Sequence, residues 1–370
     1  MTISISRTAL HDKLQLLSKI ISSKSSLPIL ENYLFETKDG RLFVTASNSE
    51  GRIMTSLDCI SDEDMSVCVP TTILDGLKTL PEQPVNIYVN PNSKEIQIKY
   101  NGGKFEFMGY ESAPYPVKKE FETSGCINTT AEELYNGIAK VVNLAAEDEL
   151  RPVICTVLID ASLKSLNFVG TDGHGLGILS HKKESTNNKI SIVVSRSMAS
   201  ILKSIIPVSG EDLEIKVGAD WSSVTFGDFD IMFRNVEGRY PNWKAVIPHN
   251  NDKELIVDTK QLIGAIKRTV VFSNKVTCLI ILKMANGELT VSAHDLDYST
   301  SAEEMLSVEF EGNEFQIGVK GSLILEMLSF INDERTKLTF SQSSSAILIM
   351  PEKQQENQEL TYLLMPMVIQ

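Results

Sequence analysis

The segment ISISRTALHDKLQLLSKI, residues 3–20, decides the fold because its pattern returns twice along the chain. Its first residues alternate between apolar and polar, as in a half-buried strand, and the apolar residues that follow have helical spacing. The same order is found in INTTAEELYNGIAKVVNL, from Ile127, and in IVDTKQLIGAIKRTVV, from Ile256. One leucine position is common to the three segments, namely Leu10, Leu134 and Leu262. This repeat is much longer than those of solenoid proteins, so it indicates repeated domains.

A hairpin pattern follows each of these segments. The stretches YLFETKDGRLFVTAS, TVLIDASLKSLNFVGT and LIILKMANGELTVSA each contain two alternating strands around a turn. Asp39-Gly40 and Asn286-Gly287 favour tight hairpin turns, because these residue types tolerate a positive φ. A second strand-to-helix unit comes next in each copy, with its junction at Pro70, Ser195 or Lys320.

Each copy ends with further alternating strands, and the last of them carries Tyr115-Pro116, Tyr240-Pro241 or Met365-Pro366. Because helix, hairpin, helix and strands keep one order three times, we expect three homologous domains of the α+β class. Each domain should have two helices backed by antiparallel sheets. The expected boundaries are 1–122, 123–250 and 251–370.

Composition excludes several classes of protein. The chain has 370 residues, 42% of them hydrophobic, which suits more than one core, since single cores stop growing at roughly 250–300 residues. No apolar run approaches the roughly 18 residues of a membrane span, and the first residues do not form a signal peptide. We therefore expect a cytoplasmic protein without a membrane partner. The five cysteines include no CxxC pair, so we expect buried thiols, no metal and no cofactor.

Charge is distributed unevenly along the sequence. The formal net charge is −13, yet the six expected helices contain ten basic and five acidic residues, which gives them +5 and leaves −18 for the rest. This segregation suits helices that face DNA phosphates, since neutralising phosphates requires only Lys and Arg. Ordinary surface lysines and arginines are the alternative explanation. No base-reading module is present, so any DNA contact should be nonspecific.

Five motifs carry a resemblance to a known family: KSSLPIL (24–30), TDGHGLG (171–177), EGRYPNW (237–243), VVFSN (270–274) and YLLMPM (362–367). With them, the triplicated chain resembles the bacterial DNA sliding clamps, the β subunits of the DNA polymerase III holoenzyme. The resemblance implies the DNA clamp fold, with the helices on an inner face and two subunits closed head to tail as a homodimeric ring. It also implies a processivity factor without enzymatic activity that encircles double-stranded DNA and tethers the polymerase.

Partners in this family insert a short linear peptide into a hydrophobic pocket between the second and third domains. Carried over by motif, the pocket residues are Ile154, Thr171, Gly173, His174, Leu176, Pro241, Val246, Leu363, Met365, Pro366 and Met367. The implied partners are the DNA polymerase III catalytic subunit, an ATP-dependent clamp loader and other proteins with a clamp-binding motif. The chain lacks a GxxxxGKS/T loop, so it should not hydrolyse ATP itself. Gly175 and Val368 depart from the family, which often has basic residues there.

The resemblance also points to residues for DNA binding and for ring closure. For DNA it points to Lys24 and Arg196, and the helical positions add Arg7, Lys13, Lys203 and Lys267. For the dimer interface it points to Val271 and Phe272, which would meet Phe105 and Phe107 of the other subunit. Ordinary core packing is the alternative for these four apolar residues.

Two functions of other classes stay open at this point. A metal-dependent hydrolase could use Asp172 and His174, with His294 and Asp295 in the third copy, as acid/base groups or ligands. A lone pair of this kind at the end of a strand is more often an arrangement that stabilises a turn. The other alternative is a scaffold that is not a clamp and binds peptides through the tail at Met365-Pro366-Met367.

Overall fold

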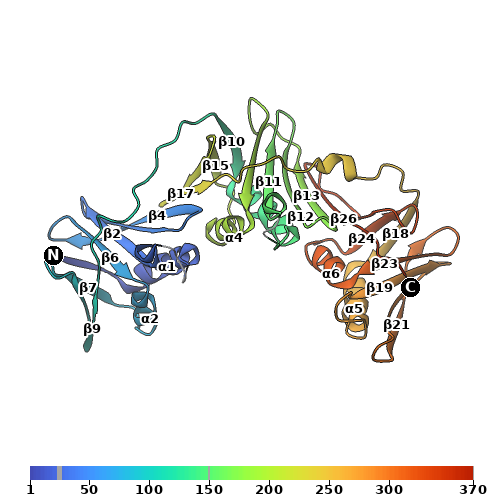
Figure 1. The fold of residues 1–370 in the computed structure, drawn as a ribbon, viewed down its shortest axis with the longest axis horizontal. Coiled ribbons are helices and arrows are strands. Elements are labelled where there is room, and N and C mark those ends of the chain that lie inside the picture. Colours follow the sequence, from blue (N-terminus) through green and yellow to red (C-terminus); the bar gives the residue numbers. More distant parts are fainter. Residues whose placement is uncertain (23–26, 149–150, 370) are drawn as a thin grey trace. The chain divides into compact units, whose positions relative to one another are not determined.

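The computed structural model of the chain describes residues 1–22, 27–148 and 151–369 (Figure 1). Its α-helices are Arg7–Leu17 (α1), Thr72–Lys78 (α2), Ala131–Val141 (α3), Arg196–Ile205 (α4), Thr259–Val270 (α5) and Gly321–Ser329 (α6). Short 3-10 helices are Ser18–Ile20 (η1), Pro28–Glu31 (η2), Val142–Leu144 (η3), Pro152–Ile154 (η4) and Trp243–Val246 (η5). The α-helices number two in each copy, as the sequence predicts. Within the described residues, no helix is long and apolar enough to cross a membrane.

The strands form four antiparallel sheets. The first has the order β5-β1-β7-β8-β9, with Thr2–Ser6 (β1), Ile60–Ser61 (β5), Pro84–Val89 (β7), Glu95–Tyr100 (β8) and Gly103–Met108 (β9). The fourth has the order β21-β20-β19-β23, with Leu279–Ala285 (β19), Glu288–Asp295 (β20), Thr300–Ser307 (β21) and Phe315–Lys320 (β23).

The second and third sheets are longer because each contains strands from two copies. The second has the order β10-β15-β16-β17-β4-β3-β2-β6, with Asn32–Lys38 (β2), Arg41–Ser47 (β3), Gly51–Asp58 (β4), Met65–Pro70 (β6), Gly125–Thr130 (β10), Asp212–Val217 (β15), Trp221–Phe226 (β16) and Phe229–Arg234 (β17). The third has the order β14-β11-β12-β13-β26-β25-β24-β18-β22, with Thr156–Ala161 (β11), Leu166–Thr171 (β12), Gly175–His181 (β13), Ile190–Ser195 (β14), Lys253–Asp258 (β18), Glu309–Phe310 (β22), Arg335–Phe340 (β24), Ile347–Pro351 (β25) and Gln358–Leu364 (β26).

These shared sheets explain why the three copies form two compact units. Unit 1 contains residues 1–135 and 200–235, and unit 2 contains residues 136–199 and 236–370. In unit 1, β17 of the second copy pairs with β4 of the first. In unit 2, β26 of the third copy pairs with β13 of the second. The second copy is therefore divided between the sheets that it shares with its two neighbours.

Each described α-helix begins at or just after the end of a strand, and polar side chains cap the starts of α1, α3, α4 and α5. Ser6 and Asp258 accept hydrogen bonds from the backbone N–H of Ala9 and Gln261, three residues later, at 3.2 and 2.8 Å. Such N-caps stabilise a helix by about 1 kcal/mol. The shared leucine position is fully buried in all three copies, so the helical periodicity identified the core face correctly.

Both hairpin dipeptides adopt the expected turn. Asp39 and Gly40 have φ of 51° and 73°, and Asn286 and Gly287 have φ of 51° and 80°. Two successive residues with positive φ match the twist of the flanking strands, which is why Asp-Gly and Asn-Gly are favoured here.

The expectation of buried thiols was wrong for four of the five cysteines. All five are free, but Cys68 alone is buried, whereas Cys59, Cys126, Cys155 and Cys278 are half-exposed. The reason is their position: Cys126 is on β10, an edge strand, and the other three lie just outside strands.

Candidate functional site

An apolar cluster lies in unit 2 where the second copy meets the third. Its buried members are Leu158, Val169, Leu176, Ile178, Val193, Tyr240 and Leu363, and half-buried Val153, Val236, Trp243, Ile247, Ala346 and Leu348 pack against them. We call these residues the junction cluster. They come from β11 to β14, from β25 and β26, and from the segments around η4 and η5. The pairing of β13 with β26 brings Leu176 opposite Leu363 and so joins the two copies.

A tight turn between β12 and β13 supports one side of the junction cluster. The Asp172 carboxylate accepts hydrogen bonds from the backbone N–H groups of His174 and Gly175, at 2.8 and 2.6 Å. The Thr171 hydroxyl donates to the carbonyl of Gly175 at 2.6 Å, and Gly173 has a φ of 90°, which favours glycine. Asp172 and His174 thus belong to one turn, in which the carboxylate is bonded to backbone.

The chain's last residues border the same cluster. The backbone N–H of Met365 donates to the carbonyl of His174, and that of Met367 donates to the carbonyl of Gly318, both at 2.8 Å. These two bonds fix the tail after β26 ends. The side chain of Met365 is 43% exposed and that of Val246, in η5, is 56% exposed. Apolar side chains beside the cluster are therefore accessible to a ligand.

The structure brings most of the expected pocket residues to this place. Leu176 and Leu363 are members of the cluster, Pro241 lies between Tyr240 and η5, and the others lie in the turn, η4, η5 or the tail. Sequence reasoning missed the other members of the cluster, among them Val153, Trp243, Ile247, Ala346 and Leu348. Trp243 could have been found, because it ends the EGRYPNW motif. Leu348 could not, because it enters through the pairing of β25 with β26.

Gly175 has two side chains of α6 close to it. A Cβ at this position would lie 2.8 Å from Cε of Met327 and 3.1 Å from Cδ2 of Leu323. Both neighbours belong to α6, which packs closely against the start of β13. A larger residue at position 175 would have to displace these side chains.

A polar recess of about 630 Å³ lies beside the same turn in unit 2. Its charged lining includes Arg151, Asp172, Arg196, Lys320, Glu147 and Glu326. Arg196 pairs with Glu147 at 2.9 Å and donates to the carbonyl of Ala145 at 3.0 Å. Burial raises the pKa of the Glu326 carboxyl, although a hydrogen bond from Asn143 and the charge of Arg196 oppose this. Charges of both signs line the recess.

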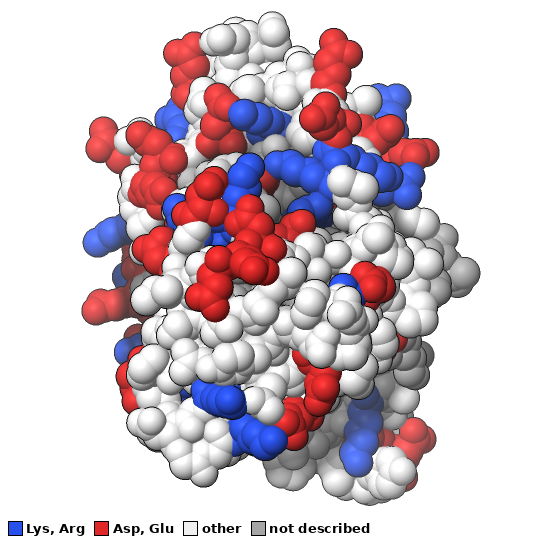
Figure 2. All heavy atoms as spheres, turned by 90° about the vertical axis from the view of Figure 1, so that its left-hand side faces the viewer, with Lys and Arg blue, Asp and Glu red and all other residues white. Residues whose placement is uncertain are grey.

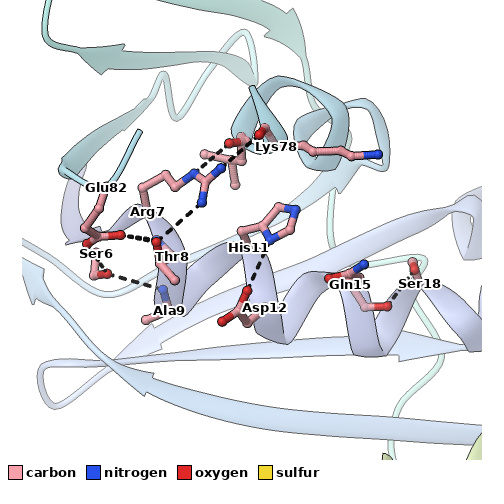
Figure 3. A network of polar contacts seen from close by, with 11 residues as sticks. Ser6, Arg7, Thr8, Ala9, His11, Asp12, Gln15, Ser18, Lys78 and Glu82 are labelled. Atoms are coloured by element: carbon pink, nitrogen blue, oxygen red, sulfur yellow. Dashed lines mark hydrogen bonds and ion pairs between the residues drawn. The ribbon is translucent and has the colours of Figure 1, made fainter. Parts of the chain in front are cut away.

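The expected DNA-binding residues differ in their exposure and in the contacts that they make within the chain. Arg7 connects α1 to α2, because its Nε and Nη2 donate to the carbonyls of Leu77 and Lys78 at 2.7 and 2.9 Å (Figure 3). Lys13 lies 4.3 Å from the ring centre of Phe229 and 3.8 Å from Asp228.

Three further DNA candidates remain. Lys24 lies outside the described residues. Lys203 is half-exposed and Lys267 is exposed, and neither makes an ion pair within the described part of the chain. On the side of unit 1 where β9 and α2 lie, basic and acidic side chains are mixed, with a broad uncharged area between them (Figure 2). The net positive charge of the helices therefore does not by itself describe a DNA-facing surface, because several of the helical cations also contact protein groups.

The expected interface residues lie in different units. In unit 2, Val271 is 73% exposed and Phe272 is 43% exposed, directly after α5. Ordinary core packing therefore does not describe them. In unit 1, Phe105 and Phe107 are half-buried on β9, and the ring of Phe105 lies 4.9 Å from that of Tyr100.

No group of three or more His, Cys, Asp and Glu side chains in the described residues could hold a metal ion. His174 is exposed, and the carboxylate of Asp172 is bonded to the turn. The arrangement is that of a binding surface formed by an apolar cluster, a rigid turn and a polar recess.

Family models decide what kind of protein carries this surface. The N-terminal, central and C-terminal domain models of the DNA polymerase III beta subunit match residues 1–119, 128–242 and 244–368. The chain belongs to the DNA polymerase III beta-subunit family. It is a sliding clamp, a DNA polymerase processivity factor that is not an enzyme and that has DNA and a polymerase as partners. The three clamp domains and the resemblance drawn from the five motifs are confirmed.

Relatives of this sliding clamp match over its whole length. The beta sliding clamp of Pseudomonas putida is 26% identical over 370 residues, covering 99% of this chain and 100% of the relative. That of Escherichia coli K12 is 24% identical with similar coverage. The structure of a Pseudomonas aeruginosa sliding clamp bound to griselimycin has a TM-score of 0.93 at 25% identity and covers all of both chains. The hydrolase and the non-clamp scaffold find no support among them.

Proposed function

We propose that two copies of this clamp subunit close head to tail into a ring around duplex DNA, in the cytoplasm, with domains at 1–122, 123–250 and 251–370. The junction cluster binds linear peptides of the DNA polymerase III catalytic subunit, of an ATP-dependent clamp loader and of other partners. One observation carries the ring: among the edge strands of the described sheets, two stand where the other copies have strands that pair across a junction, and the internal repeat indicates that these two match each other.

These two edge strands are β21 and β9. Within the chain, the third strand of the first copy's hairpin sheet, β4, pairs with β17, and the corresponding strand of the second copy, β13, pairs with β26. The corresponding strand of the third copy is β21, and the first copy's counterpart of β17 and β26 is β9. Both are edge strands among the described sheets. An exposed edge is a template for pairing with another chain, so β21 and β9 of two copies should pair.

The repeat also gives the register of this pairing. In the two intrachain junctions, the residue pairs that face the helices include Ile53–Ile231 and Gly177–Tyr362. The corresponding edge residues are Ala302, which pairs with buried Ala293, and Phe105, which pairs with buried Ile98.

This register brings opposite charges together. With Phe105 opposite Ala302, Phe107 lies opposite Thr300 and Lys104 lies opposite Glu303. The hydroxyl of Thr300 donates to the carbonyl of Phe272, so Phe107 would approach Phe272, as expected for the interface.

The peptide site rests on the chemistry of the junction cluster. A bound peptide needs an apolar pocket for its anchors and a few polar groups around it. Exposed Met365 and Val246 lie beside the buried side chains of the cluster, and the polar recess lies nearby. Methionine is unbranched and polarizable, so it can repack around the different anchors of several partners.

A topological experiment tests the ring. Retention by encirclement needs no tight contact, which suits a chain with a net charge of −13. We expect subunits loaded onto nicked circular DNA by a clamp loader to stay bound through gel filtration, and to leave within minutes once a restriction enzyme linearises the DNA. Blocking both ends of the linear DNA with bulky protein should restore retention. Equal retention on open linear and circular DNA would contradict encirclement.

A further inference from the structure

At both intrachain junctions, a lysine from one copy donates a hydrogen bond to the C-terminal end of the second helix of the next copy. In unit 1, Nζ of Lys19, in η1, donates to the carbonyl of Ser204 in α4 at 3.4 Å. In unit 2, Nζ of Lys140, in α3, donates to the carbonyl of Phe330, the C-cap of α6. The last carbonyls of a helix carry partial negative charge and lack intrahelical partners, so a cation suits them.

The contact at Lys140 is well embedded. Its ammonium group lies 5.8 Å from the ring centre of Phe330, and burial lowers its pKa. The hydroxyl of Tyr362 donates to the backbone carbonyl of the same lysine at 3.0 Å. Lys140 therefore connects α3 of the second copy to two elements of the third, α6 and β26.

With the unit 2 contact as the reference, the repeat places Arg268 where a third such contact belongs. Aligning α3 with α5 through Leu134 and Leu262 puts Arg268 at the position of Lys140. Aligning α6 with α2 through Lys320 and Pro70 puts Leu80 at the position of Phe330.

The two helix ends have the same local structure. The backbone N–H of Leu80 donates to the carbonyl of Leu77 at 3.1 Å, as that of Phe330 does to Met327 at 3.3 Å. Arg7 uses the carbonyls of Leu77 and Lys78, which come earlier in α2 (Figure 3). The carbonyl at position 80 corresponds to the one that Lys140 binds in the next junction.

Arg268 is held in a position from which it could bind another chain. Its Nε and Nη2 donate to the two carboxylate oxygens of Glu304, on β21, at 2.8 and 2.5 Å. Its Nη1 makes no hydrogen bond to the described residues, and the side chain is 64% exposed. The ion pair therefore fixes the guanidinium beside the free edge and leaves one nitrogen for a further acceptor.

We propose that Arg268 makes the third junction contact between subunits, with its Nη1 donating to the carbonyl of Leu80 of the partner subunit while Glu304 orients the guanidinium. This inference rests on the head-to-tail ring proposed above. It assigns to Arg268 the closure of each subunit junction and to Glu304 a positioning role. Since a two-subunit ring has two such junctions, one substitution removes the contact twice.

Sedimentation of the full-length chain over a dilution series tests the assignment. We expect Arg268→Ala to raise the dimer dissociation constant at least tenfold. Arg268→Lys should stay within about threefold of wild type, because a lysine makes the corresponding contact at position 140. Glu304→Ala should fall between the two, at about threefold. Lys260→Ala, which removes an exposed cation of the same helix, should stay within twofold, and thermal unfolding checks that each variant folds.

Three results would overturn the assignment. An Arg268→Ala variant that dimerises like wild type shows that Arg268 makes no closing contact. An equal loss with Lys260→Ala shows that only the general charge matters. Losses of tenfold or more with both Glu304→Ala and Arg268→Lys show that the intrachain ion pair is what counts. A wild-type chain that stays monomeric refutes the ring itself, whereas a dimer unaffected by Arg268→Ala refutes this inference alone.

Discussion

Glu326 is half-buried in the polar recess, near Arg196 and Asp172. Burial raises its pKa, so the folded chain binds this proton more tightly than the unfolded chain does. The resulting stabilisation is fully present below the unfolded pKa of about 4.3 and is lost as the pH rises through the folded pKa. Glu326→Gln stays neutral and can still accept from Asn143. We expect it to unfold at a higher temperature than wild type at pH 7, with the difference vanishing near pH 4.

The control for this prediction is Glu356→Gln, which removes an exposed carboxylate in a turn. Its unfolding temperature should follow that of wild type at every pH from 4 to 8. Thermal unfolding followed by circular dichroism provides the measurement. If Glu326→Gln is less stable than wild type at pH 7, the carboxylate contributes more through Arg196 than burial costs.

At the scale of elements, the turn of Asp172 recurs in the first copy. The side-chain oxygen of Asn48 accepts from the backbone N–H groups of Glu50 and Gly51, both at 2.8 Å, as Asp172 does from His174 and Gly175. Asp172→Ala leaves the N–H groups of His174 and Gly175 without their acceptor, which costs about 1–2 kcal/mol. We expect exchange of the Gly175 amide to speed up about tenfold in that variant, as measured by hydrogen exchange.

The matched variant Asp172→Asn keeps a side-chain oxygen as the acceptor. Asparagine already accepts the corresponding hydrogen bonds at position 48. Its Gly175 amide should exchange at nearly the wild-type rate. Asn48→Ala should loosen the first turn as Asp172→Ala loosens the second. A rate for Asp172→Asn as high as that for Asp172→Ala would show that the negative charge, and not the hydrogen-bond geometry, holds the turn.

The sequence predicts elements that depend on local pattern. The helices and the Asp39-Gly40 and Asn286-Gly287 turns follow from spacing and from residues that tolerate positive φ. The pairing of β4 with β17 does not, because the two strands lie far apart in the chain and their register depends on tertiary packing. For the same reason the contribution of β25 to the junction cluster and the bond from Lys140 to Phe330 became visible only in the structure.

At the scale of the whole molecule, the net charge of −13 conceals local pairing of opposite charges. Several helical cations that were expected to face DNA also contact helix ends, aromatic rings or carboxylates of the chain itself. The sequence therefore predicted the repeat and the family but not these contacts of the cations within the chain. These contacts depend on burial and on tertiary hydrogen bonds and ion pairs, which cannot be read from the sequence.

The proposed register of β9 against β21 can be tested by exchanging charges across the subunit junction. Lys104 should lie opposite Glu303, so Lys104→Glu places two carboxylates against each other at both junctions of the ring. Like charges directly opposite in a sheet are destabilising, by roughly 0.2–1 kcal/mol per pair. Because Lys104 also pairs with Glu106 at 2.7 Å in its own strand, the substitution adds a repulsion there as well. We expect the dimer dissociation constant to rise about tenfold in sedimentation measurements at low salt.

Glu303→Lys alone should weaken the dimer in the same direction, whereas the double variant with Lys104→Glu should recover to within about threefold of wild type, because the pair is restored with its signs exchanged. All differences should shrink at high salt, since exposed charges are screened beyond roughly 3 Å at 1 M ionic strength. A shift of the register by one residue would move Lys104 away from Glu303, and the double variant would then be no better than the sum of its two single changes. Recovery in the double variant therefore depends on the register that the two intrachain junctions share.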